Sequence, residues 1–351
     1  MTESNSFYSP DILTRKRQVT DSIADDFVKF IFVDTQSKIA LREYLATLNY
    51  NSQLSQLPTA YADQPLFALA NHLPEWANSK QMQQGAAFFA RHASLIMNML
   101  GLLSLPYTYA GADGVKVLYL SERMRTDTAK RLQETGDFVW EVMAPNAFKP
   151  EGKGFASILK VRLIHAAARY YTLQSGRWNA EWGQPVNQED MAGTNLSFSL
   201  LVIRGLRKLD VAITYADQQA FMHLWNVIGA LSGVERSLLP DDGKQAIALE
   251  QAISKHVFRP SEEGQALTQS LIDYFTSLTL PAPFGSKETV QLMRFLLGDE
   301  IADILALPKG EAPTTIINLL KLNGTLQEIK WLPSVNRAYQ QQYADFKKQQ
   351  L

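Results

Sequence analysis

The chain has 351 residues, a formal net charge of -1 and 46% hydrophobic residues, which is enough apolar material for a sizeable core. Because this composition creates no broad basic field, it excludes nucleic acid and anionic membrane surfaces as main partners. The absence of cysteine excludes disulfides, iron–sulfur clusters and thiol catalysis.

Signals for export or membrane insertion are missing from the sequence. Residues 1–21 contain neither a positively charged start followed by an apolar run nor a twin-arginine motif, which predicts a cytoplasmic protein. The longest apolar run, residues 93–106, is shorter than the about 20 residues that cross a bilayer and fits a buried helix better. We therefore expect no membrane span.

The N-terminal part of the chain shows mainly helical periodicity. Residues 21–46 predict two amphipathic helices, or one helix broken near Thr35. Prolines interrupt residues 51–84, and a strong apolar pattern resumes over residues 85–103. Residues 115–120 (VKVLYL) are the one strand-like run, although the same letters fit the edge of a buried helix.

A helix is predicted from about residue 122 to residue 143, before Pro145. Three of its polar residues are spaced i, i+3 and i+4 and share a face: Arg131, Glu134 and Thr135. They either point into one cavity or form a solvated salt-bridge face, which spacing alone favours. Gly136 costs about 1 kcal/mol relative to alanine and indicates close approach by a flat group, another backbone or a neighbouring helix.

Residues 160–171 (KVRLIHAAARYY) predict a helix with a histidine between two arginines. Arg162, His165 and Arg169 are three and four positions apart and project from one face. Two nearby cations disfavour a charged imidazole, so a nitrogen lone pair stays free for a metal. Guanidinium groups also match the geometry of carboxylates. From spacing alone, a core histidine that hydrogen-bonds to a neighbour is the commoner explanation.

Two later motifs have structural explanations. Asn187 and Asp190 resemble a helix N-cap and its reciprocal partner before an apolar run. Gly229 and Gly233 are four apart on a predicted helix, the spacing that lets two helices, or a helix and a ring, come close. His223, on the same helix, is a second candidate metal ligand. The remaining histidines have no partner at a metal-ligand spacing such as HxxxH: His72, His92 and His256.

The C-terminal part contains two predicted helices and a polar tail. Residues 290–297 and 315–322 predict helices on either side of a loop at residues 308–314. Residues 334–351 carry few apolar anchors and predict a surface helix or a frayed end.

Four blocks together resemble the rubber oxygenase, or latex clearing protein, family and its MpaB-like relatives. They are RLQETGDFVWEV from Arg131, VRLIHAAARYY from Val161, WGQPVNQEDMAGTNLSFS from Trp182 and FMHLWNVIGALSGV from Phe221. The resemblance implies an all-α protein with a globin-like core around b-type haem. It places the haem domain at residues 51–310, a helical extension at residues 1–50, and further helices with the polar tail at residues 311–351.

The resemblance also implies roles for the candidate residues. His165 is expected to be the proximal iron ligand, and His223 is expected only to pack beside a tryptophan. Arg162 and Arg169 are expected to hold the haem propionates. The residues expected to face the sixth iron position are Arg131, Glu134 and Thr135.

Glu134 departs from the family pattern. Relatives carry a lysine there that can cap the iron, and a carboxylate cannot imitate a neutral amine. This difference puts the six-coordinate resting state and the activity on polyisoprene in doubt. Glu134 can instead act as a proton relay or base, provided that burial favours its protonated form.

The function implied is a haem-dependent oxygenase that combines molecular oxygen with a small apolar organic substrate. Two alternatives stay open. One is a haem protein without turnover, such as a gas sensor or haem carrier. The other is a haem-free helical scaffold in which His165 and the arginines form a buried polar network. The sequence identifies neither the substrate, the electron source nor the oligomeric state.

Overall fold

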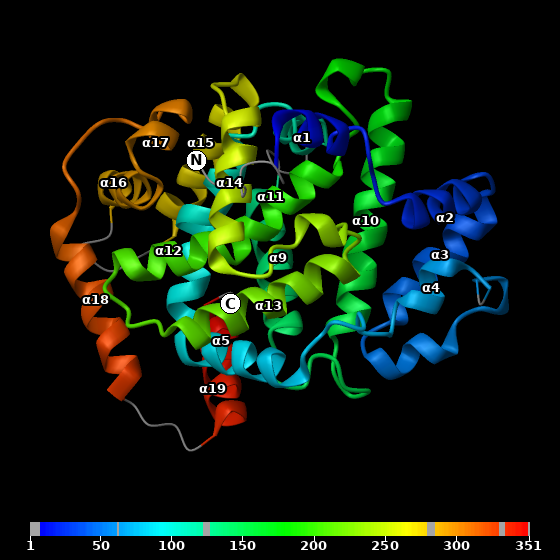
Figure 1. Ribbon diagram of the computed structural model, residues 1–351, viewed down its shortest axis with the longest axis horizontal. Helices are drawn as coiled ribbons and strands as arrows, with labels where there is room; N and C mark the ends of the chain where they lie inside the picture. Colours follow the sequence, from blue (N-terminus) through cyan, green and yellow to red (C-terminus); the bar gives the residue numbers. More distant parts are fainter. Residues whose placement is uncertain (1–7, 62, 122–126, 279–284, 330–333, 350–351) are drawn as a thin grey trace.

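Helices make up the regular structure of the described part of the chain. The computed structural model describes residues 8–61, 63–121, 127–278, 285–329 and 334–349 (Figure 1). Within these residues the β-type pairing is one isolated antiparallel bridge, between Gly111 and Phe258. The predicted all-α fold is confirmed, whereas the division of the chain at residues 51 and 310 stays a prediction.

The α-helices are α1 (Pro10–Lys16), α2 (Ser22–Phe32), α3 (Thr35–Thr47), α4 (Pro65–Leu69), α5 (Ser79–Met99), α6 (Leu105–Tyr109), α7 (Val115–Leu120), α9 (Thr128–Val142), α10 (Gly154–Gln174), α11 (Gln188–Phe198), α12 (Leu200–Lys208), α13 (Tyr215–Leu231), α14 (Gly243–Val257), α15 (Glu262–Ser277), α16 (Ser286–Leu297), α17 (Asp299–Ile304), α18 (Thr314–Ile329) and α19 (Val335–Gln349). Short 3-10 helices are η2 (Asn51–Gln56), η3 (Thr59–Tyr61), η5 (Ala180–Trp182) and η6 (Arg236–Leu238), and η4 (Leu100–Ser104) is a π-helix.

Several local predictions are decided by these bounds. The helix expected over residues 21–46 is two helices, α2 and α3, which meet near Thr35 as predicted. The VKVLYL run is helix α7, so its strand alternative is wrong. The helix expected from residue 122 is described from Thr128, and residues 122–126 lie outside the described part of the chain.

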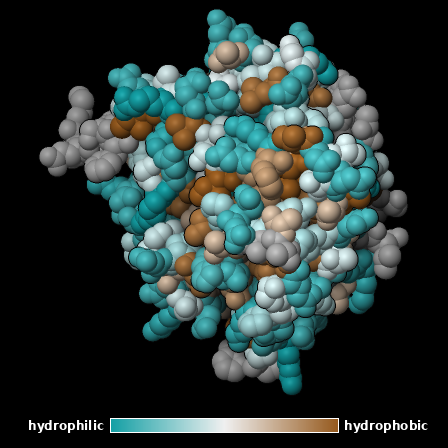
Figure 2. Space-filling model, turned by 90° about the vertical axis from the view of Figure 1, so that its right-hand side faces the viewer, coloured by the Kyte–Doolittle hydropathy of each residue, from teal (hydrophilic) through white to brown (hydrophobic). Residues whose placement is uncertain are grey.

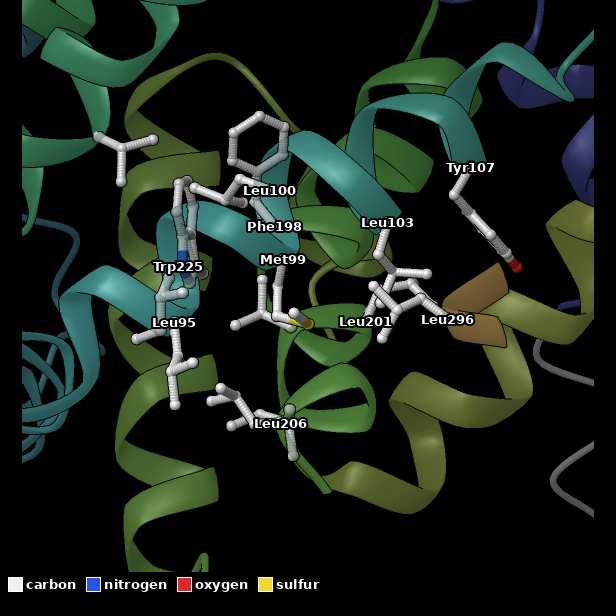
Figure 3. Close-up of a cluster of buried hydrophobic side chains, with 14 of the residues drawn as sticks. Leu95, Met99, Leu100, Leu103, Tyr107, Phe198, Leu201, Leu206, Trp225 and Leu296 are labelled. Atoms are coloured by element: carbon white, nitrogen blue, oxygen red, sulfur yellow. The ribbon is translucent and has the colours of Figure 1, made fainter. Parts of the chain in front are cut away.

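The core is organised around α5 and α13. The two backbones come close at Gly85, where an added Cβ would lie 2.6 Å from the carbonyl oxygen of Ala220. Figure 3 shows apolar side chains of α5 and η4 meeting residues of α11, α12, α13 and α16. The labelled residues in that cluster are Leu95, Met99, Leu100, Leu103, Tyr107, Phe198, Leu201, Leu206, Trp225 and Leu296. Burial of this continuous apolar surface is the main term that stabilises the fold.

The apolar run at residues 93–106 belongs to a longer helical stretch. Helices α5, η4 and α6 join into one stretch, Ser79–Tyr109, which by length and composition alone is long and apolar enough to cross a membrane. Of its most apolar window, 61% is buried among the other helices. That burial agrees with the prediction of a buried core helix.

The side chain of Gln342, near the C-terminal end of the sequence, interrupts the backbone hydrogen bonding in the middle of α5. His92 has non-helical dihedral angles, φ -115° and ψ 16°. In an uninterrupted helix the N–H of Ser94 bonds to the carbonyl of Ala90. Here Ser94 N donates to Oε1 of Gln342 at 3.0 Å, and Nε2 of Gln342 donates to the oxygen of Ala90 at 2.9 Å. The inserted amide satisfies both backbone groups and explains the kink.

The polar tail is therefore anchored rather than frayed. It forms α19, whose Tyr339 hydroxyl donates to the carbonyl of Trp140 at 2.7 Å. The rings of Trp140 and Tyr343 lie 5.3 Å apart. An added Cβ at Gly136 would come within 2.8 Å of the Phe346 ring, so the close approach predicted there is made by this side chain.

The N-terminal helices α2, α3 and α4 lie together at one side of the molecule (Figure 1). They enclose a second apolar cluster with the first half of α10. Figure 2 views this side and shows hydrophobic residues gathered near the centre of the face. Exposed apolar side chains of α2, its C-cap and α10 are Phe30, Val33, Ile164, Tyr171 and Leu173.

Candidate functional site

Helices α9 and α10 form the walls that carry the predicted site residues. The chain reverses between them over residues 143–153, where Nδ2 of Asn51 donates to the carbonyls of Ala147 and Lys149 at 2.7 and 2.6 Å. Gly152 is needed in this turn because an added Cβ would lie 2.0 Å from the oxygen of Asn146. The reversal packs α10 against α9.

His165 is partly accessible as a residue, whereas its imidazole is surrounded by protein atoms. Its Nδ1 is buried and has no hydrogen-bond partner. Burial, followed by the positive charge of Arg169, lowers its pKa to about 4, and the carboxylate of Asp21 acts in the opposite direction. The imidazole is therefore neutral at pH 7, as predicted. The main cause is burial, however, and the second contributing cation is Arg131 rather than Arg162.

Arg162 is already bound to a carboxylate of the protein. Its Nε and Nη2 donate to the two oxygens of Asp21 at 2.5 and 2.8 Å, and its Nη1 donates to the carbonyl of Leu231 at 3.4 Å. Both partners of the ion pair are buried. Because Asp21 uses the guanidinium fork, this geometry does not favour the expected contact between Arg162 and a propionate.

Arg169 keeps one free donor. Its Nε donates to Asp25 at 2.5 Å and its Nη1 donates to the carbonyl of Val186 at 3.2 Å. Its Nη2 is buried without a partner. A buried unsatisfied N–H costs free energy, so this atom is suited to a carboxylate supplied by a ligand.

On α9, Arg131 and Thr135 are partly buried, whereas Glu134 is exposed. Nε of Arg131 is buried without a partner, and the Thr135 hydroxyl donates to the Arg131 carbonyl at 2.9 Å. Glu134 is 50% exposed and pairs with Arg131 Nη1 at 3.3 Å, as in a surface i, i+3 pair. The burial that a proton relay at Glu134 requires is therefore not found.

Tyr109, at the end of α6, is a site residue that sequence reasoning missed. Its side chain is almost completely buried, and its hydroxyl has no partner. Burial raises its pKa, and the charge of Arg131 opposes this effect, which associates Tyr109 with Arg131. The sequence around Tyr109 is typical of a buried helix, so no sequence signal distinguishes this tyrosine from an ordinary core residue. Unpartnered polar atoms of Tyr109, Arg131 and His165 thus come from three different helices.

His223 has a structural role. Its Nε2 accepts the backbone N–H of Asn78, the N-cap of α5, at 2.9 Å. Its ring contacts Trp76 edge to face at 5.7 Å, which agrees with the expected packing beside a tryptophan. Because an accepting lone pair is already used, His223 is the weaker candidate for an iron ligand.

Gly229 and Gly233, both predicted on the same helix, have different structural roles. Gly229 lies in α13 against the side chain of Asn195. Gly233 lies beyond the helix, with φ +94°, so its predicted place on the helix is wrong. The N–H of Gly233 bonds to Ala230 and that of Val234 to Gly229, as in a Schellman motif. Gly233 therefore terminates the helix instead of mediating helix contact within it.

The predicted N-cap at Asn187 is confirmed. Its side chain accepts the N–H of Asp190 at 2.9 Å, and its Nδ2 donates to the Asp190 carboxylate at 2.7 Å. The neighbouring Glu189 is buried between Arg17, at 3.2 Å, and Nδ1 of His256, at 2.8 Å. These ion pairs fasten α1 to α11 and α14, and they account for His256 without a metal ligand role.

Comparisons with known proteins assign the chain to a family. The family described as ER-bound oxygenase mpaB/B'/Rubber oxygenase, catalytic domain, matches residues 80–324. The protein named Rubber oxygenase from Streptomyces sp. (strain K30) is 26% identical over 243 residues. That match covers 68% of this chain and 59% of the relative, so the chain spans about three fifths of the relative's length.

A solved structure of latex clearing protein LCP in the closed state superimposes with a TM-score of 0.78 at 22% sequence identity. The match covers 93% of this chain and 90% of that structure, so the two share a fold across nearly their whole lengths. With the family match extending over more than half of the chain, the protein belongs to the family of mpaB and rubber oxygenase catalytic domains.

Proposed function

We propose that this protein is a b-type haem oxygenase that uses molecular oxygen on an apolar organic substrate, with His165 as the proximal iron ligand. The observation that carries the proposal is the imidazole of His165, which is neutral at pH 7 and surrounded by protein atoms, while the residue is partly accessible. A neutral imidazole is the form that ligates haem iron. Membership of an oxygenase family supports the reaction class.

The surrounding residues fit such a group in most respects. Nη2 of Arg169 is a buried free donor suited to a propionate carboxylate. Arg131, whose charge acts on both His165 and Tyr109, has an unpartnered Nε, and the Tyr109 hydroxyl is a further unpartnered donor; both can hold polar atoms of a bound ligand. Haem, when bound, supplies the activation of oxygen, and these residues bind and orient the haem. Arg162 does not fit a propionate role because Asp21 already pairs with it.

The substrate class is proposed only as an apolar organic molecule. The named relative is a rubber oxygenase, which supports an apolar substrate. Polyisoprene itself is not part of the proposal, because the family resemblance implies a lysine at the position of Glu134, and Glu134 is half exposed.

Absorption spectroscopy and oxygen uptake test the proposal. Protein purified with haem supplied is expected to show a Soret band and to consume oxygen with lipid or terpenoid candidates. A Soret band without oxygen uptake would favour a gas sensor or haem carrier. A colourless protein after haem reconstitution would contradict both.

The ion pairs of the two arginines favour one alternative, a haem-free helical scaffold. Arg162 and Arg169 each find a carboxylate on α2, so much of the predicted polar network is satisfied within the protein. The unpartnered atoms of Arg131, Arg169 and His165 are what this alternative leaves unexplained. The same spectrum separates the two, because a scaffold stays colourless.

A further inference from the structure

We propose that Asp21 is a positioning residue of the iron site, which holds Arg162 in a buried ion pair and thereby lowers the reduction potential of an iron bound to His165. The inference rests on the proposed haem function. It adds a residue from outside the region that the family match covers, residues 80–324.

The first argument is the place of Arg162. It precedes His165 by three residues on α10, so the two side chains leave neighbouring points of one helix face. Asp21 binds both Nε and Nη2 of this guanidinium, at 2.5 and 2.8 Å. The Arg162 and Asp21 side chains are 9% and 4% exposed, so water screens their charges weakly.

The second argument is that Asp21 is held in place from three directions. It is the N-cap of α2, with Oδ1 accepting the N–H of Ala24 at 3.4 Å. It meets Arg162 of α10. It also lies against the glycine that ends α13, since an added Cβ at Gly233 would be 2.3 Å from Oδ2. A carboxylate fixed in this way keeps one position relative to α10.

The third argument is the balance of charges around His165. Arg162 precedes His165 by three residues on α10, and Arg169 follows it by four residues, so both guanidinium groups flank the histidine on one helix face. Arg169 has its own carboxylate, Asp25, which lies four residues after Asp21 on the same helix. Asp21, the N-cap of α2, and Asp25, in its first turn, therefore offset the positive charges of Arg162 and Arg169, one carboxylate for each arginine.

The consequence follows from electrostatics. Reduction of ferric iron adds one electron and removes one positive charge from the site. An uncompensated guanidinium nearby stabilises the ferrous state relative to the ferric state, because the ferrous site carries less positive charge. Asp21 cancels that effect of Arg162, so removing its charge is expected to raise the potential.

The test is a spectroelectrochemical titration of the haem-loaded protein, with dithionite as reductant. Asp21→Asn removes the charge with little change of shape, and its midpoint potential is expected to rise. Asp21→Glu keeps the charge and is expected to restore the wild-type potential. Glu250→Gln is the control, because it removes a different buried carboxylate, that of Glu250, which pairs at 2.8 Å with the more exposed Arg204 on α12. It is expected to leave the potential unchanged.

A double variant, Asp21→Asn with Arg162→Gln, distinguishes the effect of an unpaired charge from the effect of a disturbed structure. It also replaces the single variant if Asp21→Asn does not fold. Because the two replaced side chains carry no net charge, like the wild-type ion pair, the double variant is expected to keep a midpoint potential near that of the wild type. An unmoved potential in Asp21→Asn, or an equal rise in the double variant or in Glu250→Gln, would overturn the inference. A wild-type protein without a Soret band would instead overturn the proposed function, and this inference with it.

Discussion

At the residue scale, His165 is set apart by the combination of burial, partial access and cationic neighbours. His92 is also buried, its Nδ1 has no partner and its pKa is lowered to about 4 by burial, but it packs against Phe88 inside the core. His223 and His256 use their ring nitrogens in contacts with Asn78 and Glu189. Among the described histidines, His165 best meets the requirements of an iron ligand.

Replacing His165 by alanine is expected to abolish the Soret band, and added imidazole is expected to restore it. His223→Ala is the control. It should keep a near-native haem spectrum and lose about 1 kcal/mol of stability, because the Asn78 N–H loses its acceptor. Absorption spectra and urea unfolding measure both effects. The reverse pattern would assign the ligand to His223.

Tyr109→Phe is expected to stabilise the haem-free protein by about 1 kcal/mol, because it removes a buried hydroxyl that has no hydrogen-bond partner. If the hydroxyl bonds to the bound group, haem affinity falls by about fivefold, equivalent to about 1 kcal/mol. Tyr107→Phe is a matched control, since the Tyr107 hydroxyl bonds to Glu250. It should cost about 1–3 kcal/mol of stability without changing haem affinity. Haem titration distinguishes the two tyrosines.

The titration of His165 predicts acid sensitivity of the haem-free protein. Its pKa is about 4 in the folded state against an ordinary value of 6.5, so the unfolded chain binds more protons between these pH values. The stability contribution is therefore complete above pH 6.5 and is lost as the pH falls towards 4. His165→Phe should remove part of this loss, on the order of 2 kcal/mol. Urea unfolding midpoints at pH 7 and pH 5 measure this loss of stability. An equal fall of the midpoint in the wild type and in His165→Phe would contradict the prediction.

At the element scale, the shape of α5 depends on a helix more than 240 residues away in the sequence. The Gln342 amide of α19 replaces the backbone hydrogen bond between Ala90 and Ser94. The resulting kink lies at His92, midway along the helix that continues through η4 and α6 to Tyr109. The docking of α19 thus helps to set the direction of the segment that carries Tyr109.

Gln342→Leu is expected to destabilise the protein by about 1 kcal/mol, because the part-buried carbonyl of Ala90 and the exposed N–H of Ser94 lose their hydrogen-bond partner. Hydrogen exchange of the Ser94 amide should become faster. Gln341→Leu is the control, since its side chain is exposed on the same helix. Equal exchange rates at Ser94 in the two variants would show that the amide does not hold the kink.

At the scale of the whole molecule, both ends of the chain close around the helices that carry the candidate site. Helix α2 supplies Asp21 and Asp25 to α10, and α19 packs its aromatic side chains on α9 at Trp140. The family match at residues 80–324 includes neither α2 nor α19. The surroundings of the site are therefore completed by segments outside the matched region.

The sequence by itself determined the helices, the histidine helix with its two arginines, the N-cap at Asn187 and the family. These features depend on spacing of three and four residues and on local hydrogen bonds, which the order of residues specifies directly. Only the tertiary structure decided that Asp21 and Asp25 pair with the arginines, that Glu134 faces solvent, that Tyr109 is left without a partner, and that Gln342 opens α5. Each of these depends on contacts between segments distant in the chain, and such contacts are set by how the helices pack rather than by any local pattern.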